Sequence, residues 1–129
     1  MTQPIDENKY NKSQIYILKS PHSNRFYIGS TIQGYQLRKL KHYYDYKGFH
    51  GITPKFRHYR TSFKIIDDGD YYVELLEDYK CDNKKDLLIR ETEYIHYYKN
   101  KYGDRLVNKY LPNKINTDDL LFNNIVDCV

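Results

Sequence analysis

The sequence predicts an α+β domain in which a small sheet is covered by helices. Three observations carry this prediction. Two β-rich runs separated by a turn stand near the N-terminus, two later segments repeat apolar residues at helical spacing, and another β-rich run lies between those segments. The order of elements is β-β-α-(β)-β-α-β-α, which is typical of helices packed on a sheet. The 129 residues suffice for one such domain and exclude two.

The first predicted element is a β-hairpin. Residues 13–19 (SQIYILK) and 25–30 (RFYIGS) are the β-rich runs, and residues 20–24 (SPHSN) between them have turn chemistry. The preceding residues, 1–12, are polar and irregular, so we expect a flexible N-terminal arm there.

A helix is predicted over 35–47, because Leu37, Leu40 and Tyr44 recur at helical spacing and Gly48 marks its end. Arg38 and His42 lie four residues apart on a neighbouring face. After an irregular excursion over 48–59, residues 62–66 (SFKII) predict a strand, 67–70 a turn, and 71–79 (YYVELLEDY) the third strand of the sheet.

A long second helix follows, capped by Asp82 or Asn83 and ended by Asn100 and Gly103. Its three- and four-residue steps run through Leu87, Leu88, Glu91, Tyr94, Ile95 and Tyr98. Residues 106–110 form a short β-like piece. Residues 111–129 are predicted to be a C-terminal extension with a short helix over 120–126, capped by residues 117–119 (TDD).

Charge is distributed unevenly along the chain. The net charge is +4, but residues 38–60 contain seven bases and one acid, interleaved with aromatic residues and histidines. Such a mixture suits phosphate contacts and stacking on bases, and the alternative is a solvated basic face. Besides Arg38, the candidate nucleic-acid-binding residues are Lys39, Lys41, Lys47, Lys55, Arg57 and Arg60.

Two cysteines, Cys81 and Cys128, are too few for a disulfide framework and lie far from any His/Cys cluster that would bind structural zinc. The N-terminus has no apolar leader, and no stretch approaches the roughly 18–20 apolar residues of a membrane span. We therefore expect a soluble, intracellular protein with no membrane partner.

Two tripeptides of the hairpin resemble the paired signature of the GIY-YIG nuclease family. They are Gln14-Ile15-Tyr16 and Tyr27-Ile28-Gly29, with eleven residues from Tyr16 to Tyr27 and with Gln14 in place of the family's first glycine. Further motifs follow in family order: Arg38-x-x-x-His42, Arg90-Glu91-x-x-Tyr94-Ile95 and Val107-Asn108. The resemblance spans residues 13–110 and implies a GIY-YIG nuclease domain whose central three-stranded, mostly antiparallel sheet is flanked by helices.

The resemblance also implies a function: a metal-dependent endonuclease that hydrolyses DNA phosphodiester bonds by a one-metal mechanism. Tyr16 and Tyr27 would line the active site, one of them as the general base. Arg38 would stabilise charge on the phosphate, and Glu91 would hold Mg²⁺ or Mn²⁺. His42 would bond a catalytic tyrosine or a phosphate, and Asn108 would position the site.

Physical chemistry constrains these roles. A tyrosine has a pKa of about 10, so a tyrosine base needs a neighbouring cation such as Arg38 to favour the phenolate. Tyr16 is the favoured base because the first strand of a hairpin is the more deeply desolvated one. On the second predicted helix Glu91 falls on or beside the buried face, whereas Glu93 is expected to point toward solvent.

Alternatives of other classes stay open: a catalytically silent nucleic-acid-binding module, or a structure-specific nuclease subunit that requires a partner. The chain is similar to the catalytic domains of homing endonucleases and to small viral nucleases, and a viral protein would act in the host cytoplasm or nucleus. The expected partner is DNA. One active site cuts one strand, so a double-strand break would need a homodimer, two encounters or reorientation on the duplex. A separate recognition subunit would supply sequence specificity.

Overall fold

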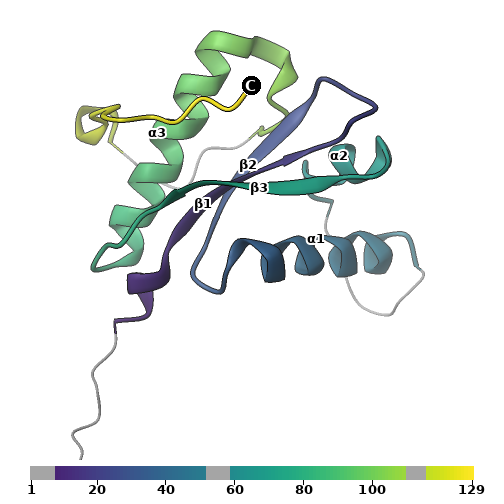
Figure 1. Cartoon of the computed structure of the whole chain (residues 1–129), viewed down its shortest axis with the longest axis horizontal. Coiled ribbons are helices and arrows are strands. Elements are labelled where there is room, and N and C mark those ends of the chain that lie inside the picture. The colour runs from purple at the N-terminus through teal and green to yellow at the C-terminus, as the bar shows by residue number, and fades with distance from the viewer. Residues whose placement is uncertain (1–7, 52–58, 110–115) are drawn as a thin grey trace, which may run out of the picture.

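A computed structural model describes residues 8–51, 59–109 and 116–129. It contains a three-stranded antiparallel sheet with helices on both faces (Figure 1). The strands are β1 (Gln14–Lys19), β2 (Phe26–Thr31) and β3 (Tyr72–Asp78), in the order β2-β1-β3. The predicted α+β class, the hairpin and the third strand are confirmed. The central position of β1 leaves its side chains buried on both faces.

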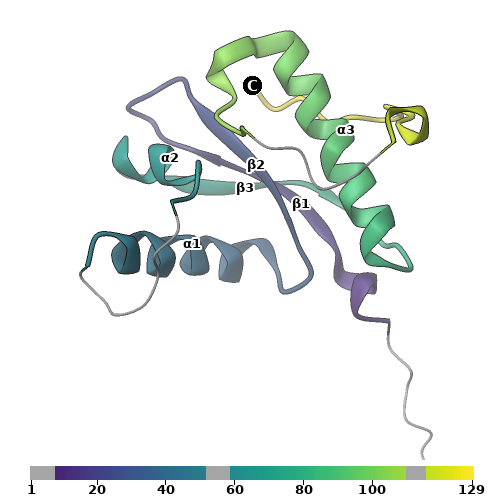
Figure 2. The same cartoon turned by 180° about the vertical axis from the view of Figure 1, so that it is seen from behind.

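Helix α3 (Lys84–Tyr102) covers one face of the sheet (Figure 2). It begins where predicted, because the Asn83 side chain accepts a hydrogen bond from the Asp86 backbone N–H at 2.9 Å. Its apolar side packs with alternate residues of β1 and β2. The buried members of this core are Ile15, Ile17, Phe26, Ile28, Leu76, Cys81, Leu87, Tyr94, Ile95, Tyr98 and Leu106.

The other face is covered by α1 (Tyr35–Phe49) and α2 (Phe63–Asp67). The strand predicted over 62–66 is wrong, because this segment is the short helix α2. Its backbone N–H groups bond to carbonyls three and four residues back instead of to a neighbouring strand, as in the bond from Asp68 to Lys64 at 3.2 Å. Phe63, Ile65 and Ile66 are thereby buried together.

The side of α1 that faces the sheet differs from its apolar repeat. Leu37, Leu40 and Tyr44 are 54%, 52% and 61% exposed, whereas His42 and Asp45 are buried. The helix lies over the polar ends of tyrosine side chains on β1 and β2, so polar side chains fit that interface better than leucines do.

The N-terminal arm predicted over 1–12 is wrong for its last part. Lys9–Lys12 form the 3₁₀ turn η1, whose cap Asn8 accepts a hydrogen bond from the Tyr10 N–H at 3.0 Å. The Asn8 amide also donates to the Cys81 carbonyl at 3.0 Å. Residues 1–7 lie outside the described residues.

The C-terminal helix predicted over 120–126 is wrong as well. Thr117–Asp119 form a 3₁₀ turn, η3, and the rest of the tail, which is irregular and has a turn at 123–124, lies along α3. Side chains of α3 hold it there: Tyr98 donates to the Val126 carbonyl at 2.7 Å, and Lys101 pairs with Asp127 at 2.6 Å. These tertiary bonds replace the backbone bonds that a helix would make.

The short β-like piece after α3 is reduced to one bridge. The 3₁₀ turn η2 (Gly103–Arg105) ends α3, and Leu106 then pairs in parallel with Phe26 at the outer edge of β2. Within the described ranges, no helix has both the length and the apolar character needed to cross a membrane.

Candidate active site

Tyr16 and Tyr27 lie on the same face of the sheet, as the hairpin predicts. Tyr16 pairs with Gly29 across the strands and Tyr27 with Leu18, so the two tyrosines are diagonal neighbours. The Tyr16 ring lies directly over Gly29, and a β-carbon at position 29 would collide with the phenol. The glycine at this position is thus needed for the ring to occupy its place.

The Tyr16 hydroxyl contacts His42 of α1. It lies 2.7 Å from Nε2, and Nδ1 of the same ring lies 2.8 Å from the Ser62 hydroxyl just before α2. Tyr16 is 1% exposed and His42 is fully buried. His42 of α1 therefore links Tyr16 of the sheet to Ser62 of the loop through hydrogen bonds. The predicted bond from His42 to a tyrosine is one of them.

His42 is neutral in this environment. Burial, and then the positive charges of Arg38, Arg60 and Lys41, lower its pKa to about 3. A neutral imidazole has one N–H donor and one acceptor nitrogen, so each of its two bonds has a fixed direction once the tautomer is chosen. With the proton on Nδ1, Ser62 accepts and Nε2 accepts from Tyr16.

Both tyrosines keep their protons more firmly than the sequence argument expected. Burial raises the pKa of Tyr16 well above its usual value of about 10, and the neighbouring Tyr27 adds to this, while Arg38 opposes it. Burial and then Glu91 raise the pKa of Tyr27 to about 12. Arg38 favours the phenolate as expected, but in the protein alone desolvation outweighs this attraction and both pKa values stay raised.

Arg38 is the common electrostatic neighbour of the site. Its charge lowers the pKa values of Tyr16, Tyr27 and Glu91 and disfavours protonation of His42. Within the described ranges no carboxylate forms an ion pair with it. The Arg38 guanidinium, without an ion-pair partner there, therefore acts on four other predicted site residues, Tyr16, Tyr27, His42 and Glu91.

Glu91 reaches the site from α3 on the opposite side of β2. Its carboxylate accepts a short hydrogen bond from the Ser30 hydroxyl at the end of β2. Burial raises its pKa, and the Ser30 bond and Arg38 partly offset that rise. A desolvated carboxylate beside a hydroxyl offers the oxygen donors that hydrated Mg²⁺ prefers. In the described part of the chain no group of three or more His, Cys, Asp or Glu side chains could hold a metal, so the magnesium prediction depends on this single carboxylate.

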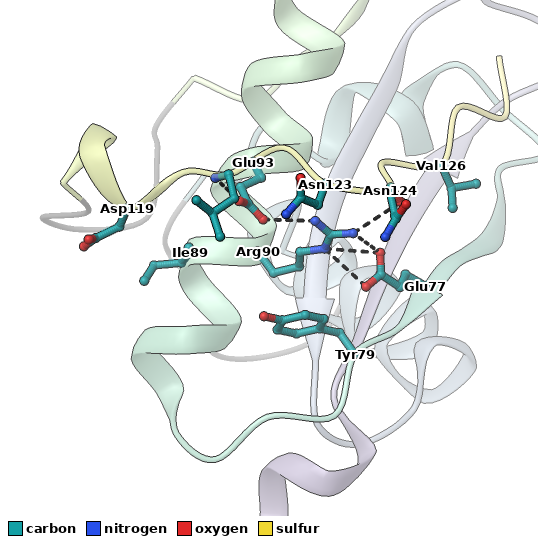
Figure 3. A pocket seen from close by; sticks show the side chains of 10 residues that line it. Glu77, Tyr79, Ile89, Arg90, Glu93, Asp119, Asn123, Asn124 and Val126 are labelled. Atoms are coloured by element: carbon teal, nitrogen blue, oxygen red, sulfur yellow. Dashed lines mark hydrogen bonds and ion pairs between the residues drawn. The ribbon is translucent and has the colours of Figure 1, made fainter.

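Glu93 corrects the predicted orientation of α3. It is buried, and not exposed as expected: one oxygen accepts from Arg90 at 3.0 Å, and the other accepts from the backbone N–H groups of Leu121 and Phe122 in the tail. Arg90 also pairs with Glu77 of β3 at 2.5 Å (Figure 3). The Glu93 carboxylate therefore binds the tail, whereas the Glu91 carboxylate binds Ser30 at the candidate site.

Asn108 fastens β2 from outside the sheet. Its side chain accepts from the Ile28 N–H at 2.9 Å and donates to the Ile28 carbonyl at 2.8 Å, as a neighbouring strand would. Ile28 lies between Tyr27 and Gly29, so this pair of bonds fixes the strand that carries one tyrosine and supports the other. The positioning role expected for Asn108 agrees with this geometry.

Gln14, the departure from the family signature, has structural bonds of its own. Its side-chain oxygen accepts from the Tyr35 N–H at 2.9 Å, at the start of α1, and its amide donates to Asp78 of β3 at 2.8 Å. Glycine could form neither bond. Gln14 thus joins the start of α1 to the central strand.

The predicted basic segment is divided in the structure. Lys41 and Arg60 both pair with the buried Asp45, at 3.1 and 3.4 Å. The ammonium groups of Lys39 and Lys47 lie over the rings of Tyr71 and Tyr43. Lys55 and Arg57 lie outside the described residues. Two of the six candidate cations are therefore partly neutralised by an internal acid.

Three further residues at the site were given no role in it from the sequence. Ser30 holds Glu91, Ser62 holds His42, and Lys84 lines a cavity beside Arg38. Ser30 directly follows the Tyr27-Ile28-Gly29 tripeptide, which is a local signal. Ser62 and Lys84 come from segments without a motif, so only the folded chain brings them to the site.

Comparison of the chain with protein-family models, with curated proteins and with solved structures finds no match.

Proposed function

We propose that this protein is a metal-dependent endonuclease of the GIY-YIG type, which hydrolyses DNA phosphodiester bonds. The observation that carries the proposal is the 2.7 Å contact between the Tyr16 hydroxyl and the neutral His42, within the field of Arg38. Of the two site tyrosines, Tyr16 alone has a hydrogen-bond acceptor for its hydroxyl among the described residues, and this bond leaves the lone pairs of its oxygen free to accept from a water.

The proton path follows from these protonation states. The Tyr16 hydroxyl donates to the neutral Nε2 of His42, which leaves the lone pairs of the Tyr16 oxygen free to accept from the attacking water. Because the pKa of His42 is about 3, the imidazole accepts this hydrogen bond without taking the proton, so Tyr16 must lose its proton to solvent before it can act as the base. Ser62 keeps the ring in the required tautomer by accepting from Nδ1. Tyr27, whose hydroxyl has no hydrogen-bond partner among the described residues, is placed to orient the water or the phosphate.

Arg38 supplies the permanent positive charge that phosphoryl transfer requires. Negative charge builds up on the non-bridging oxygens in the transition state, and a planar guanidinium can bind two of them at once. Because Arg38 has no internal carboxylate partner in the described chain, no ion pair has to be broken when the phosphate arrives.

Glu91 and Ser30 are the residues that would hold the divalent cation. Both offer oxygen, and a single carboxylate together with waters and a substrate phosphate makes a sufficient set for Mg²⁺. When bound, the cation would supply Lewis-acid stabilisation of the phosphate. The pKa of Glu91 is raised because its carboxylate is desolvated, and a bound cation would favour the charged form.

A supercoiled-plasmid nicking assay tests this proposal. We expect nicking with Mg²⁺ or Mn²⁺, and none with chelator or with Glu91→Gln. Glu74→Gln is the matched control, because Glu74 is a half-exposed carboxylate of β3 that pairs with Lys19 away from the site. The control should nick as the wild type does.

DNA binding measured on the same proteins separates the proposal from its main alternative. Wild type that binds duplex DNA but does not nick with either metal would contradict the endonuclease and favour a silent binding module. Wild type that nicks only branched substrates would instead favour a structure-specific enzyme.

A further inference from the structure

A cavity of about 390 Å³ opens beside Arg38 and Ser30. Its wall is built from four parts of the chain: η1, the end of β2 with the two residues after it, α1 through Arg38, and the first turns of α3. The charged or aromatic lining residues are Lys9, Tyr10, Arg38 and Lys84. Ser30, which holds Glu91, belongs to the same wall. The cavity is thus continuous with the candidate active site.

The part of this wall that comes from η1 is firmly attached. The Cys81 N–H donates to the Tyr10 carbonyl at 3.3 Å, and the Tyr79 N–H donates to the Ser13 carbonyl at 2.8 Å. Asn8 adds its bond to the Cys81 carbonyl. Tyr10 also packs against the apolar core under α3. These contacts hold Lys9 at the cavity, next to the start of α3 and Lys84.

The cavity is strongly positive. Lys9, Arg38 and Lys84 line it, and none of the three has an ion-pair partner in the described parts of the chain. The same chain neutralises other exposed cations internally, as Asp45 does for Lys41 and Arg60. The Lys9 ammonium also lies 5.5 Å from the centre of the Tyr10 ring. Three cations without ion-pair partners around one hollow favour a polyanionic ligand, because each phosphate contact replaces counterions that the phosphate would otherwise hold.

We propose that this cavity binds a phosphate of the DNA strand that neighbours the phosphate to be cleaved. The inference depends on the proposed endonuclease function and names the contacts by which that site would hold its substrate. Arg38 lies at the boundary, since it both lines the cavity and acts on Tyr16 and Glu91. Lys9 and Lys84 bind the neighbouring phosphate, and the Tyr10 ring and Leu87 provide an apolar wall for the sugar.

Equilibrium binding tests this directly. The measurement uses a duplex oligonucleotide and Glu91→Gln protein, so that no cleavage interferes. Lys9→Ala and Lys84→Ala should each weaken binding by about tenfold. The double variant should reduce the slope of log K against log salt concentration by about 1.8. Lys85→Ala is the control, because Lys85 is exposed on the same turn of α3 and does not line the cavity; it should change affinity by less than about twofold.

A second arm locates the phosphate. Duplexes that carry one neutral methylphosphonate at each position around the cleavage site are compared. A methylphosphonate at one position next to the cleaved phosphate should weaken binding to protein that keeps both lysines by about tenfold. The same methylphosphonate should have no further effect on the Lys9→Ala, Lys84→Ala double variant. Equal sensitivity of both proteins at every position would overturn the proposal. In active protein the lysine variants should raise KM while kcat stays within about twofold.

A third arm distinguishes the source of the phosphate. If a deoxynucleoside 5′-monophosphate binds in a manner that depends on Lys9 and Lys84 while duplex affinity is unchanged in their variants, the cavity is a mononucleotide site and the DNA contact is overturned. Absence of nicking by wild type defeats the proposed function, whereas normal nicking with unaffected lysine variants defeats only this inference.

Discussion

The two faces of the sheet differ in whether the charged groups packed against them have ion-pair partners. Under α3 the core is apolar, and Arg90 pairs there with the buried Glu93 and the partly buried Glu77, while Glu93 also accepts from the tail. Under α1 the sheet presents Tyr16 and Tyr27 to a buried histidine and to Arg38, which has no ion-pair partner in the described chain. Each face has one helix arginine, and only one of the two arginines is neutralised.

This difference separates the residues that stabilise the domain from those that are available for chemistry. A buried ion pair with every bond satisfied holds segments together, and loss of one partner leaves an uncompensated charge. A desolvated polar group without a charge partner lowers stability unless a ligand supplies one. Substitutions around Arg90 under α3 should therefore change unfolding, whereas those around Arg38, which include Glu91 of α3, should change activity.

The pair Arg38 and Arg90 should give the largest contrast. Arg90→Ala leaves Glu77 and Glu93 buried without their cation, so the free energy of unfolding should fall by about 3–5 kcal/mol in denaturant titrations. Arg38→Ala should change it by less than about 1 kcal/mol and should slow nicking by about 10²–10³-fold. An Arg90 variant with slowed nicking per folded molecule, at full stability, would reverse the comparison.

His42 should make stability dependent on pH. Its folded pKa of about 3 lies below the usual unfolded value of about 6.5. Below pH 6.5 the unfolded chain binds a proton that the folded chain does not, so stability is complete above pH 6.5 and is lost as pH falls toward 3.

Between pH 6.5 and 4 this loss amounts to about 3 kcal/mol. His42→Gln should remove that part of the pH dependence, measured as the difference in unfolding free energy between pH 6.5 and 4. An identical pH dependence in the variant would show that His42 is protonated in the folded protein.

Glu91 and Glu93 lie two residues apart on α3 and should act differently. In Glu93→Gln the new amide must place its NH₂ against either Arg90 or the N–H groups of the tail, which costs about 1–3 kcal/mol of stability. Nicking per folded molecule should be unchanged. Glu91→Gln should show the opposite pattern, and loss of nicking in both variants at full stability would contradict the division between the surroundings of Arg38 and those of Arg90.

Tyr16 and Tyr94 provide the finest comparison, because each loses one hydroxyl when changed to Phe and about 1 kcal/mol of stability with it. Tyr94→Phe should keep the wild-type nicking rate, and Tyr16→Phe should lose nearly all of it. The wild-type rate should rise with pH from 6 to 9, since Tyr16 must ionise to act as the base and burial holds its pKa above the usual value. A rate that stays flat over this range would contradict a tyrosine base, and a loss confined to Tyr27→Phe would make Tyr27 the base.

The sequence predicted the positions of the helices and strands better than it predicted which side of each helix is buried. The hairpin, the third strand and the Asn83 cap depend on local chemistry, which the sequence displays directly. The buried side of α1 depends on what lies beneath it: because two phenols face the helix, His42 and Asp45 are buried and the leucines are not. Glu93 was misplaced for a similar reason, since the tail that covers it is more than 25 residues away in sequence.

Two segments were misassigned because tertiary contacts determine their structure. Residues 62–66 are as β-rich as a strand but form helix α2 against the sheet. Residues 117–119 have capping residues, yet the tail that follows bonds to side chains of α3 instead of to itself. In the site, Tyr16, His42 and Asn108 have the contacts expected of them, whereas Ser62 and Lys84 have no sequence signal.

The central place of β1 also has a consequence for folding kinetics. Tyr16 pairs with Leu75 of β3, and Asn108 binds Ile28 across 80 residues of chain. Such long-range contacts close large loops before they gain stabilisation, and domains rich in them fold slowly. During synthesis the hairpin can form early, but β2 receives its outer fastening only once residue 108 has left the ribosome. Every nascent chain shorter than that carries Tyr27 on a strand whose outer edge is still unpaired.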